Sequence, residues 1–352
     1  MTTESIEEAF AAQAEWCNEL GSPLYGTLLA VALNDLERNG PVATIVDDFP
    51  DDPLSSALAL RLMGGLHRLV LMGLAPDLAR HYPSAGGVPD LPTLADDFLE
   101  TVATHVGYLS DSLSVAPQTN EIGRCAALLP LLFTALEGRK YDIRLLEIGS
   151  AAGLNLFLDR YSYDFGSWTW GEASSGVVIA TDWDGAPPKS PPGLAVTSRR
   201  GCDVSPMDIS DEQGILRLLS FIWPDQVVRF TRTQRAAEIV SEDPPVVDPE
   251  PAGSWLAARL AEPVPDGTMT VVQHSVMWQY LAEAEKLGIA EAISEAGERS
   301  TPQTPLAHTS FEWPANGFTD AGHIASVATW PGGSQRTVGR GQAHGSWIEW
   351  TG

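Results

Sequence analysis

The feature that most constrains the fold of this chain is the stretch of residues 143–155, IRLLEIGSAAGLN. An apolar run ends near Glu147, two glycines follow, and a helical pattern begins at residue 154. A strand, a glycine turn and a helix start in this order are the layout of a nucleotide site in an open α/β sheet. The first turn of such a helix directs free N–H groups at a ligand. The stretch predicts a parallel sheet with residues 143–147 as its central strand.

The spacing within this turn separates the possible ligands. A dinucleotide fingerprint needs glycine where Ala151 stands, and a phosphate-binding P-loop needs a lysine that the turn lacks. The remaining pattern, acid-x-Gly-x-x-x-Gly, resembles the first motif of S-adenosylmethionine-dependent methyltransferases. An ordinary strand-to-helix connection is the alternative. The resemblance implies a cofactor site made of residues in this turn: Glu147, Gly149, Ser150, Gly153 and Asn155.

A second acid follows the next expected main strand. Residues 194–202 are a strand pattern, and Asp203 comes directly after it. Acids at this position bind ribose hydroxyls in folds of this type, so Asp203 is expected to face the cofactor and to have little structural duty. The spacing from Gly149 is longer than in a compact unit. The excess is an aromatic excursion at residues 161–193, which we expect to be a β insertion, a hairpin over one sheet edge.

The remaining patterns set the expected domain organisation. Residues 1–140 have helical periodicity, with Ser22 as the expected N-cap of the second helix. Residues 141–352 hold the strand patterns, and the last of them is an antiparallel hairpin within residues 324–350. We therefore expect an α/β chain in which an α-helical N-terminal region precedes a Rossmann-like, methyltransferase-type domain, its sheet parallel up to the hairpin.

Two further segments bring polar groups to the expected site. His274 ends the buried strand pattern of residues 268–274, and residues 118–124 place polar groups at the start of an apolar helix. Because neutral imidazole titrates near the working pH, His274 is the expected general base, with a hydrogen-bonded core role as the alternative. The expected substrate contacts are Asn120, Glu121, Arg124, Ser275 and Gln279, with capping and surface polarity as the alternative for residues 118–124.

Composition narrows the range of partners. The chain has 46 acidic and 21 basic residues and a formal net charge of −25. Such a charge repels phosphate backbones and anionic lipids, so neither nucleic acid nor a membrane is an expected partner. Three widely spaced cysteines and no secretory pattern at Met1 predict a cytoplasmic protein. A small molecule or a peptide is the expected substrate.

Several stretches together resemble a bacterial family known as domain of unknown function 2332. They are residues 21–25, 118–124, 146–155, 159–161, 223–226, 274–280 and 330–333. The similarity extends over nearly the whole chain. It implies a Rossmann-like methyltransferase architecture behind a helical N-terminal region, and it brings no established reaction.

Three functions follow from these patterns. The first is an S-adenosylmethionine-dependent methyltransferase with the residues named above. The second is a non-catalytic nucleotide- or partner-binding protein with the same fold. The third is a metal-dependent hydrolase in which His274, His308 and His344 converge from three predicted strands. Because no metal-ligand spacing accompanies these histidines, we expect no bound transition metal.

Overall fold

The structure is a computed structural model, and it describes residues 3–314 and 322–352. The chain forms two compact units. Unit 1 comprises Met1–Thr119 and Asp211–Gln234, and unit 2 comprises Asn120–Ser210 and Arg235–Gly352. The division expected at residue 140 lies elsewhere, because the buried helix α8, Cys125–Leu136, packs on the sheet and a later segment returns to the helices.

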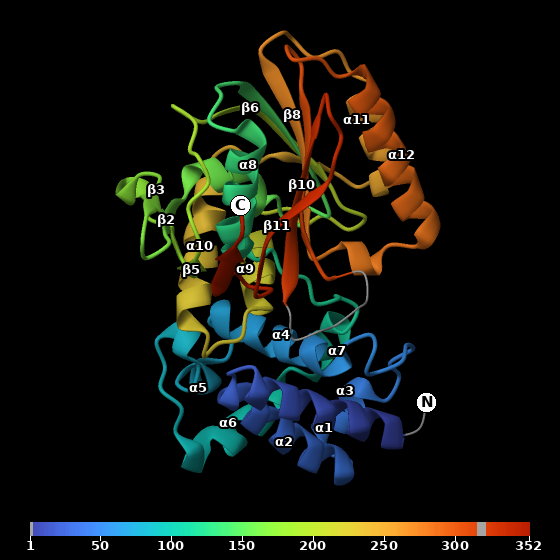
Figure 1. Cartoon of the computed structure of the whole chain (residues 1–352). Helices are drawn as coiled ribbons and strands as arrows, with labels where there is room; N and C mark the ends of the chain where they lie inside the picture. The colour runs from blue at the N-terminus through green and yellow to red at the C-terminus, as the bar shows by residue number, and fades with distance from the viewer. Residues whose placement is uncertain (1–2, 315–321) are drawn as a thin grey trace. The chain divides into compact units, whose positions relative to one another are not determined.

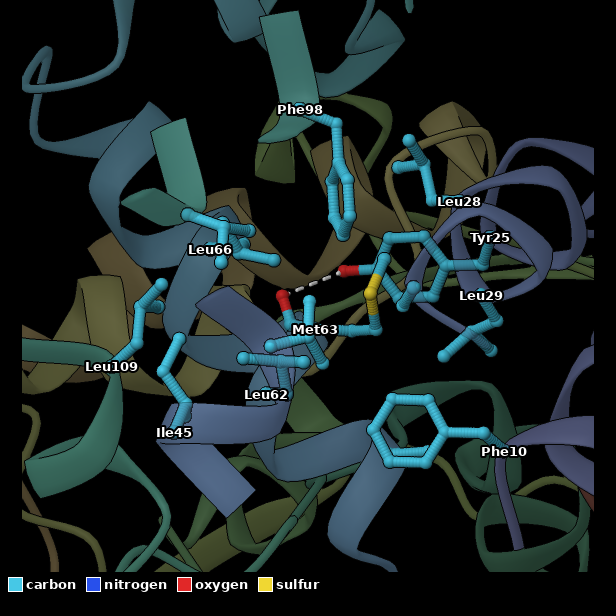
Figure 2. Close-up of a cluster of buried hydrophobic side chains, with 14 of the residues drawn as sticks. Phe10, Tyr25, Leu28, Leu29, Ile45, Leu62, Met63, Leu66, Phe98 and Leu109 are labelled. Atoms are coloured by element: carbon cyan, nitrogen blue, oxygen red, sulfur yellow. Dashed lines mark hydrogen bonds between the residues drawn. The ribbon is translucent and has the colours of Figure 1, made fainter. Parts of the chain in front are cut away.

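The described elements of unit 1 are all helices, as the periodicity predicts (Figure 1). Their buried faces form one cluster that includes Phe10, Leu28 and Phe98, and Figure 2 shows these side chains together. Tyr25 extends into the cluster and its hydroxyl donates to the Met63 carbonyl oxygen at 3.2 Å. The helices are α1 Thr3–Glu19, α2 Pro23–Glu37, α3 Pro41–Val46, α4 Leu58–Leu71, α5 Pro76–Ala79, α6 Leu91–Thr104, α7 Val106–Ser112, α9 Glu212–Ser220 and the first half of α10 Val227–Ser241, with the 3-10 turn η1 Pro83–Ala85.

The start of α2 differs from the sequence prediction. Ser22 stands at the N-cap, but its side chain caps no backbone N–H of the helix. Asp225 fills that role, because its Oδ2 accepts the N–H of Leu24 at 3.1 Å. The Ser22 hydroxyl instead donates to Asp225 Oδ1 at 2.6 Å. A carboxylate is a stronger acceptor than a hydroxyl, so the distant acid displaces the local cap.

Unit 2 is built on a nine-stranded sheet with the order β5-β12-β11-β10-β9-β8-β1-β6-β7. The five strands from β9 to β7 are parallel, and β10, β11 and β12 continue as an antiparallel meander. The strands are β1 Asp142–Ile148, β5 Asp182–Asp184, β6 Ala195–Cys202, β7 Val246–Asp248, β8 Thr268–Ser275, β9 Leu306–Glu312, β10 His323–Trp330, β11 Arg336–Gly341 and β12 Trp347–Trp350. The α/β class, the interior parallel strand β1 and the β10–β11 hairpin are confirmed.

Helices cover both faces of the parallel strands. Helix α8 packs on one face against β9 and β10. On the other face, α11 Ala252–Leu260 and α12 Glu283–Arg299 cover β1, β8 and β9 through a shared apolar cluster (Figure 1). Every residue of β8 is buried, as expected for a parallel strand between two helical layers. The fourth strand of the parallel order, β8, and the first, β1, are neighbours, so the order reverses between them.

Two local elements differ from expectation. The helical pattern after Gly153 forms a 3-10 helix, η3 Leu154–Arg160, with non-helical backbone angles at Phe157. The Leu156 carbonyl oxygen accepts a hydrogen bond from Arg199 at 2.9 Å. The aromatic excursion is more than a hairpin. It forms a three-stranded sheet, β2 Ser162–Asp164, β3 Thr169–Trp170 and β4 Val178–Ala180, and also gives β5 to the edge of the main sheet.

Within the described residues, no helix has both the length and the apolarity needed to cross a lipid bilayer.

Candidate active site

The glycine turn after β1 uses its own backbone amides to close itself. The N–H groups of Gly149 and Ser150 both donate to the Cys202 carbonyl oxygen, at 2.8 and 3.0 Å. The N–H of Gly153 donates to the Ser150 carbonyl at 2.7 Å, and the Ser150 hydroxyl donates to the Glu147 carbonyl at 2.7 Å. A ligand would have to compete for donors that already have partners.

Asp203 and Asn120 complete the closure. Asp203 accepts the N–H of Ala151 through Oδ2 at 3.0 Å and that of Ser205 through Oδ1 at 2.9 Å. Asn120 Oδ1 accepts the N–H of Leu154, the first residue of η3, at 2.7 Å. The side chain expected to bind ribose therefore ties the ends of β1 and β6 together, contrary to the small structural duty expected of it.

Glu147 lies inside the sheet layer and not on an open surface. It is 2% exposed, and its Oε2 has no hydrogen-bond partner among the described residues. Burial raises the pKa of Glu147 to about 8, although the Gln273 amide and the Arg124 guanidinium oppose that rise. The carboxyl group is therefore protonated near neutral pH. Its neighbour Asn155 is also buried, and its Oδ1 accepts the Cys125 thiol at 3.2 Å.

The other expected substrate residues divide between two places. Glu121 is buried, accepts the N–H of Gly123 at 2.8 Å, and contacts His344 Nδ1 at 3.2 Å. Arg124 donates to the Ser275 carbonyl oxygen at 3.3 Å, so Ser275 is held through its backbone. Gln279, by contrast, lines a cavity beside β8.

The end of β8 carries a chain of ionisable groups. His274 Nδ1 lies 2.7 Å from Glu312 Oε1, and His274 Nε2 lies 3.0 Å from His308 Nε2. Trp278 stacks on the His274 ring, with centroids 5.1 Å apart. The parallel pairing of β8 with β9 creates this arrangement, because His308 and Glu312 flank Ser310, the register partner of His274. Side chains two residues apart on a strand share a face.

Backbone amides hold Glu312 in place. The N–H groups of Met277 and Trp278 donate to its Oε2 at 3.1 and 3.2 Å. These amides point at the carboxylate because the chain turns sharply at Val276, whose φ is +52°. A β-branched residue in the left-handed region is strained, and such residues concentrate at functional sites. The strain at Val276 thus belongs to the machinery that orients His274.

His274, His308 and Glu312 line a cavity of about 950 Å³ between α12 and the sheet. This volume is in the range of small-molecule sites. Its lining mixes apolar and polar side chains, among them Lys286, Ile289, Ser310 and Ser326. The two serines face each other across β9 and β10, and neither hydroxyl has a hydrogen-bond partner in the described part of the chain.

His308 has an unusual electrostatic position. Burial and the nearby His274 lower the pKa of His308 to about 3, so its imidazole is neutral across the physiological range. Its Nε2 faces His274, while no partner is found for its Nδ1 within residues 3–314 and 322–352. In the same ranges, no three histidine, cysteine or acidic side chains are grouped as metal ligands, and His344 pairs with Glu121.

Comparison with known proteins identifies the family. A model described as an uncharacterized protein conserved in bacteria, DUF2332, matches residues 7–350. The chain belongs to the DUF2332 family. Neither the comparison with curated proteins nor that with solved structures gives a match. The family resemblance of the sequence motifs is thereby confirmed, and the geometry described above is that of a DUF2332 protein.

Sequence reasoning placed His274 at a strand end but missed its partner Glu312. One signal for the pair was present in this DUF2332 chain. His308, Ser310 and Glu312 alternate along one predicted strand, so a two-residue period places all three on one face. The sequence does not say which strand lies next to this one, because several strands of an open sheet could pair with it.

Proposed function

We propose that this DUF2332 protein is an enzyme that moves a proton to or from a small molecule in the cavity between α12 and the sheet. The observation that carries the proposal is the hydrogen-bonded chain Glu312–His274–His308, which ends in that cavity. A base oriented by a second residue and backed by an acid is the usual arrangement of general acid–base catalysis.

The proton positions follow from the acceptors. Glu312 accepts from His274 Nδ1, so a neutral His274 has its lone pair on Nε2. His308 must then donate through its own Nε2–H, because the two nitrogens are 3.0 Å apart. This tautomer leaves the lone pair of His308 on Nδ1. His308 is therefore the base that touches the substrate, and His274 is the residue that positions it.

The relay also explains why a weak base suffices. When His308 Nδ1 takes a proton from the substrate, its Nε2–H passes to His274 Nε2. The positive charge then rests on His274, beside the Glu312 carboxylate, and His308 is neutral again. The low pKa of His308 favours this transfer over retention of the charge. In the reverse direction, the same chain supplies a proton to the product.

Nuclear magnetic resonance of the imidazole nitrogens tests the relay without a substrate. We expect His274 as the Nδ1–H tautomer and His308 as the Nε2–H tautomer, with His308 neutral in mildly acidic buffer. Glu312→Gln removes one of two acceptor oxygens and should disturb the His274 tautomer. His105→Gln, in unit 1, is the matched control. An Nδ1–H tautomer of His308 in the wild type would contradict the relay.

Turnover provides the second test. A panel of small molecules is incubated in deuterated water, and exchange or conversion is followed by mass spectrometry. For any substrate found, His308→Gln should lower kcat by about a hundred- to ten-thousandfold, the usual contribution of a positioned base. Glu312→Gln should lower kcat less and shift its pH profile. Equal activity of wild type and His308→Gln on that substrate would refute the proposal.

Methyl transfer is a second candidate, because two acids end adjacent parallel strands. The strand order β7-β6-β1-β8-β9 is a doubly wound order that reverses between β1 and β8. Glu147 lies near the end of β1, and Asp203 follows the neighbouring strand β6. S-adenosylmethionine, if bound across this edge, would supply an activated methyl group.

The turn does not fit that cofactor as it stands. The amides of Gly149, Ser150 and Ala151 have internal partners, and Met277 lies 3.0 Å from where a Cβ of Gly149 would be. Glu147 is buried and protonated near neutrality, so it offers no exposed carboxylate to an amino group. Binding would require this edge to open.

Calorimetric titration with S-adenosylhomocysteine decides between the two candidates. Absence of binding removes the methyltransferase and leaves the proton-transfer enzyme. Binding that weakens about ten- to a hundredfold in Asp203→Asn supports methyl transfer. Binding without turnover of any acceptor supports the non-catalytic nucleotide-binding alternative.

A further inference from the structure

We infer that unit 1 contains a separate site for a small dianionic ligand, either a phosphate group or a pair of carboxylates. A second cavity of about 270 Å³ lies among helices α4, α7 and α9. Its lining includes Arg61, Arg68, Tyr108, Asp111 and Arg217. All of these residues belong to unit 1, so the site is independent of the function proposed for unit 2.

The charge around this cavity is opposite to that of the protein. Three guanidinium groups and one carboxylate leave two positive charges, in a chain whose net charge is −25. In the described part of the chain, none of the three arginines forms an ion pair with a carboxylate. In a chain with 46 acids, three neighbouring arginines beside a single carboxylate that pairs with none of them leave a net positive site.

The contacts of the three arginines differ in a useful way. Arg61 donates to two backbone carbonyl oxygens, at 2.8 Å each, which fixes its position. Arg68 donates to the Gln213 amide oxygen at 3.1 Å through one terminal nitrogen. Arg217 has no side-chain hydrogen bond within residues 3–314 and 322–352. Arg217 is thus the arginine with most capacity left for a ligand.

Two buried donors support a ligand directly. The Nε–H groups of Arg68 and Arg217 are inaccessible to solvent and have no partner among the described residues. A buried donor of this kind is costly unless an acceptor takes its hydrogen bond, and an oxyanion is a strong acceptor. Guanidinium groups bind phosphate and carboxylate with paired hydrogen bonds. One oxyanion between the two arginines would satisfy both donors.

Packing around the cavity makes it rigid and small. A Cβ on Gly64 would come within 2.5 Å of the Phe221 ring, and a Cβ on Gly65 within 2.3 Å of Ser112 Oγ. Helix α4 therefore approaches its neighbours closely on this side. The cavity volume lies just below the usual range of drug-sized sites, about 300–1,000 Å³. A small phosphorylated or dicarboxylic metabolite matches both its size and its charge.

Isothermal titration of the full chain with inorganic phosphate and, separately, with malonate tests the site. Sodium chloride at matched ionic strength controls for general salt effects. We expect one equivalent of phosphate or malonate to bind, and the stronger of the two identifies the ligand class. Arg217→Gln and Arg68→Gln should each weaken that binding about ten- to a hundredfold. Arg139→Gln, an exposed arginine paired with Glu137 in unit 2, should leave it unchanged.

Circular dichroism checks that each variant is folded. If Arg217→Gln does not fold, Arg217→Lys replaces it, because lysine retains the positive charge but lacks the planar guanidinium group. Arg217→Lys should bind the anion at least about tenfold more weakly than the wild type, the effect of losing roughly one paired hydrogen bond. The inference fails if the wild type binds neither anion, or if a folded Arg217 variant binds like the wild type. It also fails if Arg139→Gln weakens binding equally, since that would reveal a general charge effect.

Discussion

The ends of β1 and β8 lie side by side in the sheet and run into similar turns, yet the backbone amides of the two turns have different hydrogen-bond partners. Each strand runs into a sharp turn with a non-glycine residue at positive φ, Ala151 in one and Val276 in the other. After β1, the turn amides bind carbonyl and carboxylate oxygens of the protein. After β8, the amides hold Glu312, which orients a histidine relay toward a cavity.

This difference shows that the motif alone does not locate an active site. The glycine turn has the sequence of a ligand site, but its amides form hydrogen bonds within the protein. The β8 junction has no named motif, but it combines backbone strain, a buried acid and a pair of histidines at the edge of a cavity. A hydrogen-bonded chain of ionisable side chains that ends in a cavity is the better indicator of chemistry here. Three predictions test whether the two junctions differ as described.

The largest expected effect is on pH-dependent stability at the β1 junction. Glu147 titrates near 4.5 in the unfolded chain and near 8 in the folded protein. Between these values the folded state holds a proton that the unfolded state has lost, so the free energy of unfolding falls as pH rises through this window. Glu147→Gln should remove this fall, and thus stabilise the protein at pH 8 by on the order of a few kcal/mol.

Urea denaturation across this pH range measures the effect. Glu137→Gln makes the same chemical change at an exposed position and serves as control. Parallel pH profiles for wild type and Glu147→Gln would mean that Glu147 is ionised in the folded protein. That outcome would make the β1 turn a better cofactor site than its contacts suggest.

The second effect concerns Asp203 as the link between β1 and β6. Asp203→Ala removes the acceptor of the Ala151 and Ser205 amides and should lower the free energy of unfolding by about 1.5–3 kcal/mol. Asp203→Asn retains one acceptor oxygen and should cost less. Asp208→Ala is the control, because Asp208 is exposed and accepts a single amide from Ser210. Equal, small losses in the two alanine variants would restore the view that Asp203 has little structural duty.

The smallest effect compares the two strained turns directly. The left-handed conformation costs an ordinary residue about 1–2 kcal/mol, and asparagine tolerates it better. Val276→Asn should therefore stabilise the protein by up to about 1 kcal/mol, less whatever packing valine contributes. Ala151→Gly should increase the stability by a similarly small amount, because the greater flexibility of glycine in the unfolded chain offsets the relief of backbone strain. Thermal denaturation measures both, and a clear loss in Val276→Asn would show that valine's packing outweighs its backbone strain.

Local periodicity in the amino-acid sequence was enough to predict the main strands of unit 2. The runs that became β1, β6, β8 and β9 were visible as buried or alternating strands, and His274 was visible as a polar residue at a strand end. Helical periods likewise predicted the helices within residues 1–119, but not that residues 211–234 pack with them. These features are local because burial of a strand or helix face imposes a short repeat on the residues that form it.

Which of these residues come into contact depends on the three-dimensional fold. Asp225 caps α2 from about two hundred positions away, and Glu312 reaches His274 because β9 pairs with β8 in one particular register. No local pattern encodes such contacts, since they depend on which strands become neighbours and on which faces the helices cover. The same packing buries Glu147 and raises its pKa. It also closes the glycine turn, for which the sequence had predicted an open ligand site.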